Sequence, residues 1–289
     1  MSTLLILGAS GTLGQALLAE GRARGLSMAG AARKGADLAL DMTRDADLQA
    51  VLHHSSAEVV INAAASTDLE ACERDPCMAY AINARAVALV ARTCQEQGRQ
   101  LIQVSTDHYF VGQGATPHDE QASVSLVNEY ARSKFAGEAL ALTAPGALVV
   151  RTNVTGWRGW AGKPTFIEWA VQSLEAGIPL NLFHDYYTST LHASALARGI
   201  LDLWQRKATG MIHLASRQVS SKQEFILALA RRMGIPRVNH TPGSVRLLST
   251  PRAESCGLNV ALAESVLGYA LPTLDEVVDA LIAERPHAL

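Results

Sequence analysis

Short apolar segments alternate with helical patterns along the first half of the chain. Runs of mainly apolar residues predict buried strands over residues 3–7, 27–32, 58–62, 101–105 and 147–151. Between them, apolar positions at helical spacing predict helices over residues 12–24, 76–98 and 127–142. This alternation favours a parallel sheet with helices on both faces. The sequence therefore predicts a doubly wound, Rossmann-like α/β domain over residues 1–151.

The second half of the chain shows a less regular order. Glycines and a proline between residues 156 and 164 predict loops, and helical patterns follow over residues 166–177, 192–206 and 222–233. We therefore expect residues 152–289 to form a smaller substrate-binding lobe. Some of its elements are expected to return and pack on the Rossmann domain.

A glycine-rich loop lies between the first predicted strand and the first predicted helix, with the spacing G-x-x-G-x-x-G over residues 8–14. Glycine permits a tight turn and a close approach to a pyrophosphate, whose charge the N–H groups at the helix start favour. A structural turn is the alternative, but the position between strand and helix favours dinucleotide binding. The residues expected to contact the cofactor here are Gly8, Ser10, Gly11, Thr12, Leu13 and Gly14.

The end of the second predicted strand carries positive charge where an NAD site usually has an acidic residue. Arg33 and Lys34 suit the 2′-phosphate of NADP, so the sequence favours NADP and leaves NAD open; solvated loop charges are the alternative. Asp41 and Met42 are expected near the adenine, although Asp41 is nearly as compatible with an ordinary turn. Small side chains after the strand over residues 58–62 would let the backbone approach the cofactor, at Ala63, Ala64 and Ala65.

Composition narrows the classes of partner. The 289 residues carry a net charge of −2 and contain 48% hydrophobic residues, without a basic stripe, which argues against nucleic acid or an anionic membrane as a partner. The apolar run near the N-terminus is too short for a signal peptide or a membrane span, so we expect a cytoplasmic protein. Among the four cysteines, Cys72 and Cys77 lack further ligands at metal-site spacing, and no metal site is predicted.

Tyr130 and Lys134 form a Y-x-x-x-K pair within the helical pattern over residues 127–142. Their i,i+4 spacing places the phenol and the ammonium on one face of the helix. Because a nearby ammonium favours the phenolate, we expect the pKa of Tyr130 to fall below its ordinary value of about 10. Tyr130 would then exchange a proton with a carbinol or carbonyl oxygen. Taken alone, the pair is equally compatible with an exposed helical tyrosine and lysine.

Thr106 follows the predicted strand over residues 101–105, and strand ends are where open parallel sheets build their sites. Together with the features above, it makes the sequence resemble the dTDP-4-dehydrorhamnose reductase family of the extended short-chain dehydrogenase/reductase superfamily. The motifs that carry the resemblance occur in the family's order, in the first half of the chain. They are the loop over residues 8–14, Val60–Ala65, Asn83, Ser105-Thr106-Asp107, Tyr130 to Lys134 followed by Ala136-Gly137-Glu138, and Arg151-Thr152.

The resemblance implies a nicotinamide-dependent reductase in which Thr106 hydrogen-bonds the substrate carbonyl, Tyr130 supplies the proton, and Lys134 holds the nicotinamide ribose. The hydride would come from the nicotinamide. The substrate implied is a nucleotide-linked deoxysugar with a keto group, and we expect Asp107 and Asn153 to contact it. A nucleotide-sugar epimerase and a non-catalytic, NADP-binding regulatory subunit stay open as alternatives, and so does a homodimer.

The second half departs from the family pattern. Thr190 stands where the family's D-Q-x-x-[ST]-P segment has proline, and Ser255 stands where an R-P-x-N-S-x-L segment has asparagine. Arg252 is kept in that segment and is expected to bind the substrate diphosphate, with a surface arginine as the alternative. The sequence therefore predicts the hydride and proton chemistry more firmly than the identity of the sugar.

Two tryptophans and two histidines lie near the predicted site along the chain. Trp157 and Trp160 favour packing between lobes over stacking on a base or sugar, because aromatic residues serve cores and interfaces more often. His108 and His184 favour local hydrogen bonding over catalysis, because Tyr130 already supplies the acid.

Overall fold

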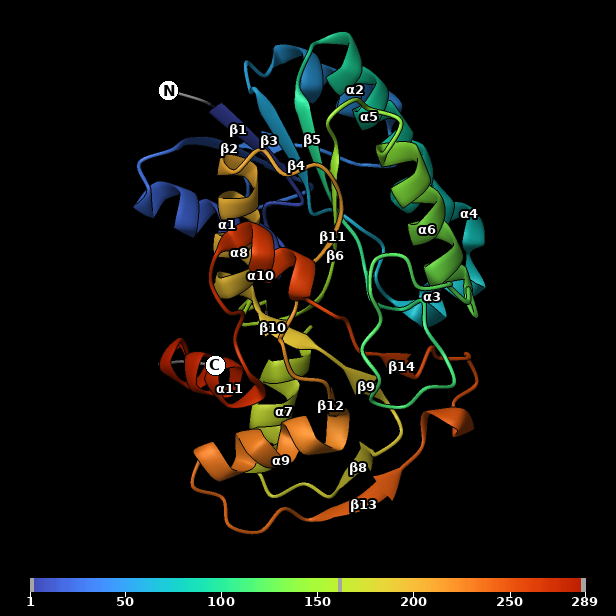
Figure 1. The fold of residues 1–289 in the computed structure, drawn as a ribbon, viewed down its shortest axis with the longest axis vertical. Helices are drawn as coiled ribbons and strands as arrows, with labels where there is room; N and C mark the ends of the chain where they lie inside the picture. Colours follow the sequence, from blue (N-terminus) through green and yellow to red (C-terminus); the bar gives the residue numbers. More distant parts are fainter. Residues whose placement is uncertain (1–2, 161–162, 287–289) are drawn as a thin grey trace.

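The computed structural model describes residues 3–160 and 163–286, and a seven-stranded, all-parallel sheet forms its upper half (Figure 1). The strand order is β11-β6-β5-β4-β1-β2-β3. The strands are β1 (Thr3–Leu7), β2 (Ser27–Ala32), β3 (Leu38–Ala39), β4 (Val59–Asn62), β5 (Gln100–Val104), β6 (Leu148–Arg151) and β11 (Gly210–His213). The predicted doubly wound, Rossmann-like α/β fold is confirmed.

Alternating side chains of β1 are buried under different helices on the two faces of the sheet. Leu4 and Ile6 belong to a core that includes α1 (Thr12–Ala23) and α8 (Ala193–Gln205). Leu5 and Leu7 belong to a second core that includes α2 (Asp45–His54) and α5 (Ala86–Glu96). Such burial on both faces explains why the strand is apolar throughout. Helix α6 (Glu129–Ala141) packs beside α5 (Figure 1).

The order of strands across the sheet changes side at β1: β2 and β3 lie on one side of it, and β4, β5 and β6 lie on the other. β1 pairs with β2 on one side and with β4 on the other, both in parallel. In open parallel sheets such a reversal leaves a crevice at the carboxyl ends of the strands. The glycine loop after β1 and the segments after β4 and β5 therefore emerge on the same edge.

Elements from the second half of the chain contribute to both parts of the molecule. β11 pairs with β6 at one end of the large sheet, and α8 packs on α1. The remaining elements form a lower lobe of short sheets and helices (Figure 1). Its strands are β7 (Asn153–Thr155), β8 (Leu180–Phe183), β9 (Tyr187–Thr188), β10 (Thr190–His192), β12 (Ser220–Ser221), β13 (His240–Gly243) and β14 (Ser255–Cys256). Its helices are α7 (Phe166–Glu175), α9 (Lys222–Arg232) and α11 (Leu274–Ala283), while α10 (Ala261–Leu267) contacts α8 and β11.

The structure adds elements that the sequence pattern did not predict. β3 consists of two exposed residues and so gives no apolar period, whereas α2 buries Leu48, Val51 and Leu52 at helical spacing, a signal that was available in the sequence. The expected helix over residues 76–98 is divided into α4 (Pro76–Tyr80), one π-helical turn η1 (Ala81–Arg85) and α5, and α3 (Leu69–Arg74) precedes it. In the described part of the chain, no helix is both long and apolar enough to cross a membrane.

Candidate functional site

The glycine loop is fixed by contacts between backbone atoms. Gly8 has a φ of +83°, which L side chains rarely adopt, and a Cβ there would lie 2.7 Å from the Ala64 nitrogen. A Cβ on Gly14 would lie 2.3 Å from the Gly8 carbonyl oxygen. The loop therefore tolerates no side chain at either position.

The N-terminus of α1 is arranged to receive an anion. Gly11 is the N-cap residue, and no described side chain caps this end or places an acidic group in its first turn. The first-turn N–H groups of a helix lack intrahelical partners and carry partial positive charge. The backbone N–H groups of Thr12 and Leu13, next to Ser10 and the small glycines, are therefore suited to a dinucleotide pyrophosphate. We call the loop over residues 8–14 and this helix start the glycine cradle.

The residues expected around the adenine end lie beyond β2. Arg33 and Lys34 are exposed at the strand's end. Asp41 accepts hydrogen bonds from the Thr43 backbone N–H at 2.9 Å and from its hydroxyl at 2.7 Å, which lower the pKa of Asp41, and Arg33 lowers it slightly further. Asp41 therefore forms a local turn close enough to Arg33 to feel its charge, and Met42 is buried beside it.

The segment after β4 is tied to the tyrosine helix. Ala63, Ala64 and Ala65 are half-buried there. Asn83, on the π-helical turn, accepts from the Ser66 backbone N–H at 2.8 Å and donates to the Ser133 hydroxyl at 3.0 Å. This turn therefore holds the alanine segment and α6 at a fixed separation, as π-turns near functional sites often do.

Thr106, Tyr130 and Lys134 converge at the end of β5. All three are buried, and the Lys134 ammonium donates to the Val104 carbonyl oxygen at 2.8 Å. Asn128 caps α6 by accepting from the Ala131 backbone N–H at 2.8 Å, which fixes where the tyrosine turn begins. The tertiary fold thus brings the three residues predicted as catalytic into one cluster.

The electrostatics of this cluster differ from the expectation in one respect. Burial raises the pKa of Tyr130 above its ordinary value, and hydrogen bonding with Thr106 offsets only part of this rise. The expected fall is therefore wrong for this structure, because removing the phenolate from water dominates. Burial also lowers the pKa of Lys134 to about 8, with Glu138 acting in the opposite direction.

Asp107 lies next to the cluster and is fully buried. Its Oδ2 accepts from the Asn153 amide at 2.8 Å, and its Oδ1 accepts from the Thr106 hydroxyl at 3.4 Å. Burial raises the pKa of Asp107 to about 7, while Lys222 and Asn153 act to lower it. The two residues expected to accompany Thr106 on the substrate side, Asp107 and Asn153, are therefore bonded to each other.

Sequence reasoning missed Tyr186 and Lys222 at this site. The Tyr186 hydroxyl lies 2.7 Å from His108 Nε2, and the His108 ring meets the Tyr130 ring edge-on at a centroid distance of 5.5 Å. Burial lowers the pKa of His108 to about 3, aided by Lys222, so this histidine is neutral at physiological pH. The capping-box pattern S-x-x-E at Ser221 was the available signal for Lys222, since it starts a helix at that residue.

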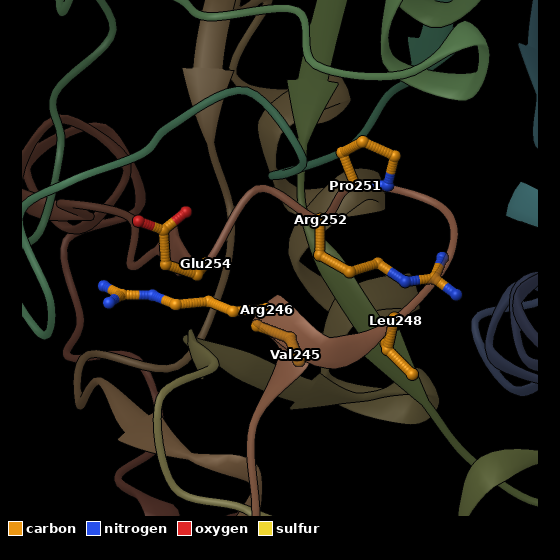
Figure 2. Close-up of a pocket in the computed structure, with 6 residues that line it drawn as sticks. All are labelled: Val245, Arg246, Leu248, Pro251, Arg252 and Glu254. Atoms are coloured by element: carbon orange, nitrogen blue, oxygen red, sulfur yellow. The ribbon is translucent and has the colours of Figure 1, made fainter.

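A cavity of about 310 Å³ lies beside Arg252 in the lower lobe (Figure 2). Figure 2 shows the side chains of Arg246 and Arg252 extending to opposite sides of this segment, with Glu254 near Arg246. Arg252 pairs with Glu70 of α3, and its charge acts on His108. The cavity is lined by Val245, Arg246, Leu248, Pro251, Arg252 and Glu254. Arg252 therefore lines this cavity and lies close enough to His108 for its charge to act there.

Other residues singled out in the sequence have structural contacts. The Trp157 indole donates to the Leu281 carbonyl oxygen at 2.9 Å and packs against the core, whereas Trp160 is exposed under the Arg158 guanidinium. The Ser255 hydroxyl donates to the Gly114 carbonyl oxygen at 2.8 Å, away from the cavity lining. His184 is exposed, and its backbone N–H donates to the Gly243 carbonyl oxygen.

Comparison with known proteins gives consistent matches over nearly the whole chain. The family model described as "RmlD substrate binding domain" matches residues 1–286. A Mycobacterium tuberculosis dTDP-4-dehydrorhamnose reductase is 37% identical, the match covering 76% of this chain and 71% of that protein. A Haloferax volcanii protein named "probable low-salt glycan biosynthesis reductase Agl14" is 29% identical over 96% of each chain.

A solved structure shares the complete fold. The dTDP-4-dehydrorhamnose reductase of Bacillus anthracis, in complex with NADP, superposes with a TM-score of 0.88 at 24% identity. The superposition covers 99% of this chain and 100% of that one. The lower lobe is therefore part of the same fold and not an unrelated addition.

Proposed function

Because this chain belongs to the RmlD substrate-binding-domain family, within the extended short-chain dehydrogenase/reductase superfamily, we propose that it reduces the keto group of a nucleotide-linked deoxysugar with NADPH. The resemblance recognised in the sequence is thereby confirmed at the level of the family and of an NAD(P)-dependent enzyme. The 4-keto group of a dTDP-linked 6-deoxysugar is the substrate by analogy with the named relatives.

The observation that carries this proposal is the convergence of Thr106, Tyr130 and Lys134 behind the glycine cradle. A hydroxyl, a phenol and an ammonium lie together at the carboxyl edge of the sheet, the edge at which the loop over residues 8–14 also follows β1. A regulatory subunit that only binds the cofactor would use Lys134 but would have less reason to keep the Thr106 and Tyr130 hydroxyls beside it.

NADPH fits the cradle because its pyrophosphate matches the uncapped start of α1, and Arg33 and Lys34 stand where a 2′-phosphate would be bound. When bound, NADPH supplies the hydride that the carbonyl carbon accepts. Lys134 would then bind the nicotinamide ribose from its position on α6, where its ammonium reaches the end of β5. The nearby segment from Ala63 to Ala65 would pack against the cofactor.

Tyr130 is the proton donor in this proposal. Its raised pKa keeps the phenol protonated at neutral pH, so the proton is present when the carbonyl oxygen gains charge. Thr106 holds that oxygen by a hydrogen bond, which fixes the carbonyl beside Tyr130. Transfer of the phenolic proton to the oxygen completes the alcohol, and the ammonium of Lys134 stabilises the phenolate that remains.

Arg252 supports the assignment of a nucleotide-linked substrate. A guanidinium binds diphosphate oxygens in two parallel hydrogen bonds, and Arg252 lines the cavity of Figure 2 while its charge acts on His108. The sugar would then lie toward Thr106, and the nucleotide would lie toward the cavity.

The test combines the protein with NADPH and a panel of 4-keto sugar nucleotides that differ in base and in sugar. Oxidation of NADPH is followed by the loss of its absorbance, and the product alcohol is identified by NMR. Turnover with a 4-keto-6-deoxysugar nucleotide supports the proposal. Binding of NADPH without oxidation by any member of the panel contradicts it and favours the regulatory subunit, whereas interconversion of stereoisomers without net NADPH consumption favours the epimerase.

A further inference from the structure

Lys222 is a lysine of the site that the chemistry above does not use. It is the first residue of α9, and its ammonium lies 4.7 Å from the centroid of the Phe166 ring, within reach also of the Tyr186 and Phe225 rings. A cation against aromatic faces is attracted by their ring quadrupoles. These rings hold the ammonium toward the catalytic cluster, where it acts on Asp107 and His108.

Hydrogen bonds join Lys222 to Asp107 through two intermediate residues. The Lys222 ammonium donates to the Thr190 hydroxyl at 3.3 Å. The Thr190 hydroxyl lies 2.9 Å from the Asn153 side-chain oxygen, to which it donates. The Asn153 amide then donates to Asp107 at 2.8 Å, and Thr106 donates to the same carboxylate. We call Lys222, Thr190, Asn153 and Asp107 the lobe relay, since it runs from α9 of the lower lobe to the end of β5.

Each hydrogen bond of the lobe relay is donated in the direction that leads from the Lys222 ammonium to the Asp107 carboxylate. A hydroxyl has one proton and two lone pairs, so Thr190 can donate to Asn153 and still accept from both Lys222 and Thr188. The side-chain oxygen of Asn153 accepts this bond, which fixes the orientation of the amide so that its N–H donates to Asp107. Thr190 also occupies the position where the family segment has proline, and proline has no hydroxyl to connect Lys222 with Asn153.

We propose that Lys222 is a positioning residue of the reductase site, which acts through Thr190 and Asn153 on the Asp107 carboxylate beside Thr106. The proposal rests on the proposed function for the role of Thr106. It couples the lower lobe to catalysis, because a shift of α9 would change the charge and the hydrogen bonds at the end of β5.

Other charged or titratable groups face Asp107 and contribute to its ionisation. His108 lies in the segment after β5, Tyr130 on α6, Tyr186 just before β9, Lys222 at the start of α9 and Cys256 at the end of β14. Burial raises the pKa of Cys256 and of both tyrosines, so these groups stay neutral near pH 7. Lys222 is the group among them that carries positive charge near neutral pH, where Asp107 titrates.

The experiment measures the titration midpoint of Asp107 in the protein without substrate. The protein is labelled with carbon-13 at the aspartate carboxyl groups, and Asp107→Asn assigns the resonance. Lys222→Met replaces the ammonium with an apolar chain of similar length between the aromatic rings. Lys207→Met is the matched control, because Lys207 is an exposed lysine before β11, at the opposite edge of the sheet. Thr190→Val interrupts the lobe relay but keeps the buried charge.

Lys222→Met is expected to raise the Asp107 midpoint by about one pH unit, because the nearby cation that favours the carboxylate is lost. Thr190→Val is expected to raise it by a smaller amount, and Lys207→Met to leave it unchanged. An unchanged midpoint in Lys222→Met overturns the proposal. A rise in Lys222→Met with no change in Thr190→Val overturns the relay, since Lys222 then acts through space alone.

The NMR measurement requires no turnover, so its result does not depend on whether the sugar substrate is correct. Once turnover is established, the acidic limb of kcat against pH is expected to move upward in Lys222→Met, in the same direction as the Asp107 midpoint. A loss of thermal stability without movement of either quantity would indicate a purely structural lysine and would contradict the proposal.

Discussion

The two halves of the site are built by different means. On the cofactor side, backbone atoms decide the geometry, since a Cβ on Gly8 or Gly14 would come within 2.7 Å of backbone. On the substrate side, side chains from separate elements decide it, as the bonds from Lys222 through Thr190 to Asn153 illustrate. The first half follows from a local motif, whereas the second requires the complete tertiary fold.

This difference indicates which part of such a protein can change its substrate specificity by substitution. A backbone cradle admits few substitutions, because any side chain strains the loop itself. A side-chain network can be altered one residue at a time without displacing a strand. In the network beside Asp107, this chain departs from its family pattern at Thr190.

The largest expected effect tests the chemistry where the two halves meet. Tyr130→Phe removes the proposed proton donor while keeping the buried ring, so kcat should fall by about 10² to 10⁴. NADPH affinity should stay within about twofold, because the ribose contact assigned to Lys134 is kept. Stopped-flow absorbance and fluorescence titration measure the two quantities. A variant that retains wild-type kcat would remove Tyr130 from the mechanism.

A second prediction breaks the cofactor side alone. Gly14→Ala places a Cβ 2.3 Å from the Gly8 carbonyl oxygen, so the loop must move and NADPH affinity should fall about 100-fold, or by about 2.7 kcal/mol. Gly11→Ala is the milder control, since its Cβ would lie 3.3 Å from the same oxygen. Calorimetric titration with NADPH measures both affinities. Equal affinities would contradict the claim that backbone contacts at Gly14 shape the cofactor site.

A third prediction breaks the substrate side alone. Arg252→Met removes the proposed diphosphate contact, so KM for the sugar nucleotide should rise about tenfold while NADPH affinity is unchanged. Arg232→Met serves as the control, because Arg232 forms an exposed pair with Asp279 and lines no part of the cavity. Equal KM values for the two variants would assign Arg252 to the surface.

The smallest expected effect is on the pH dependence of the free energy of unfolding, through Asp107 on the substrate side. The pKa of Asp107 is raised from 3.8 to about 7 in the folded protein, so the folded state binds a proton more tightly than the unfolded state. Stability contributed by this group is therefore lost as pH rises from about 4 to about 7, by at most about 1.4 kcal/mol per pH unit.

Asp107→Asn should remove this part of the pH dependence and make the stability curve flatter over that range. Chemical denaturation at several pH values measures the difference between the variant and the wild type. An identical slope in both proteins would mean that Asp107 has an ordinary pKa in the folded state.

Most of the large sheet could be predicted from the sequence because each strand is a short apolar segment buried on both faces. The start of α1 and the position of Thr106 after β5 followed from the same pattern. β3 escaped prediction because its two exposed residues give no apolar period, whereas the i, i+3, i+4 spacing of Leu48, Val51 and Leu52 could have predicted α2. Their positions depend on neighbouring elements, namely β2 for β3 and α5 for α2.

The cofactor loop and the Tyr130–Lys134 pair could be recognised from the sequence alone, because both depend on spacing within one loop or one helix turn. The burial that raises the pKa of Tyr130, and the position of Lys222 facing Asp107, which lies 115 positions earlier in the chain, arise only in the folded protein. Desolvation and through-space charge depend on what surrounds a group in the folded protein. Those surroundings come from segments whose proximity no local pattern encodes.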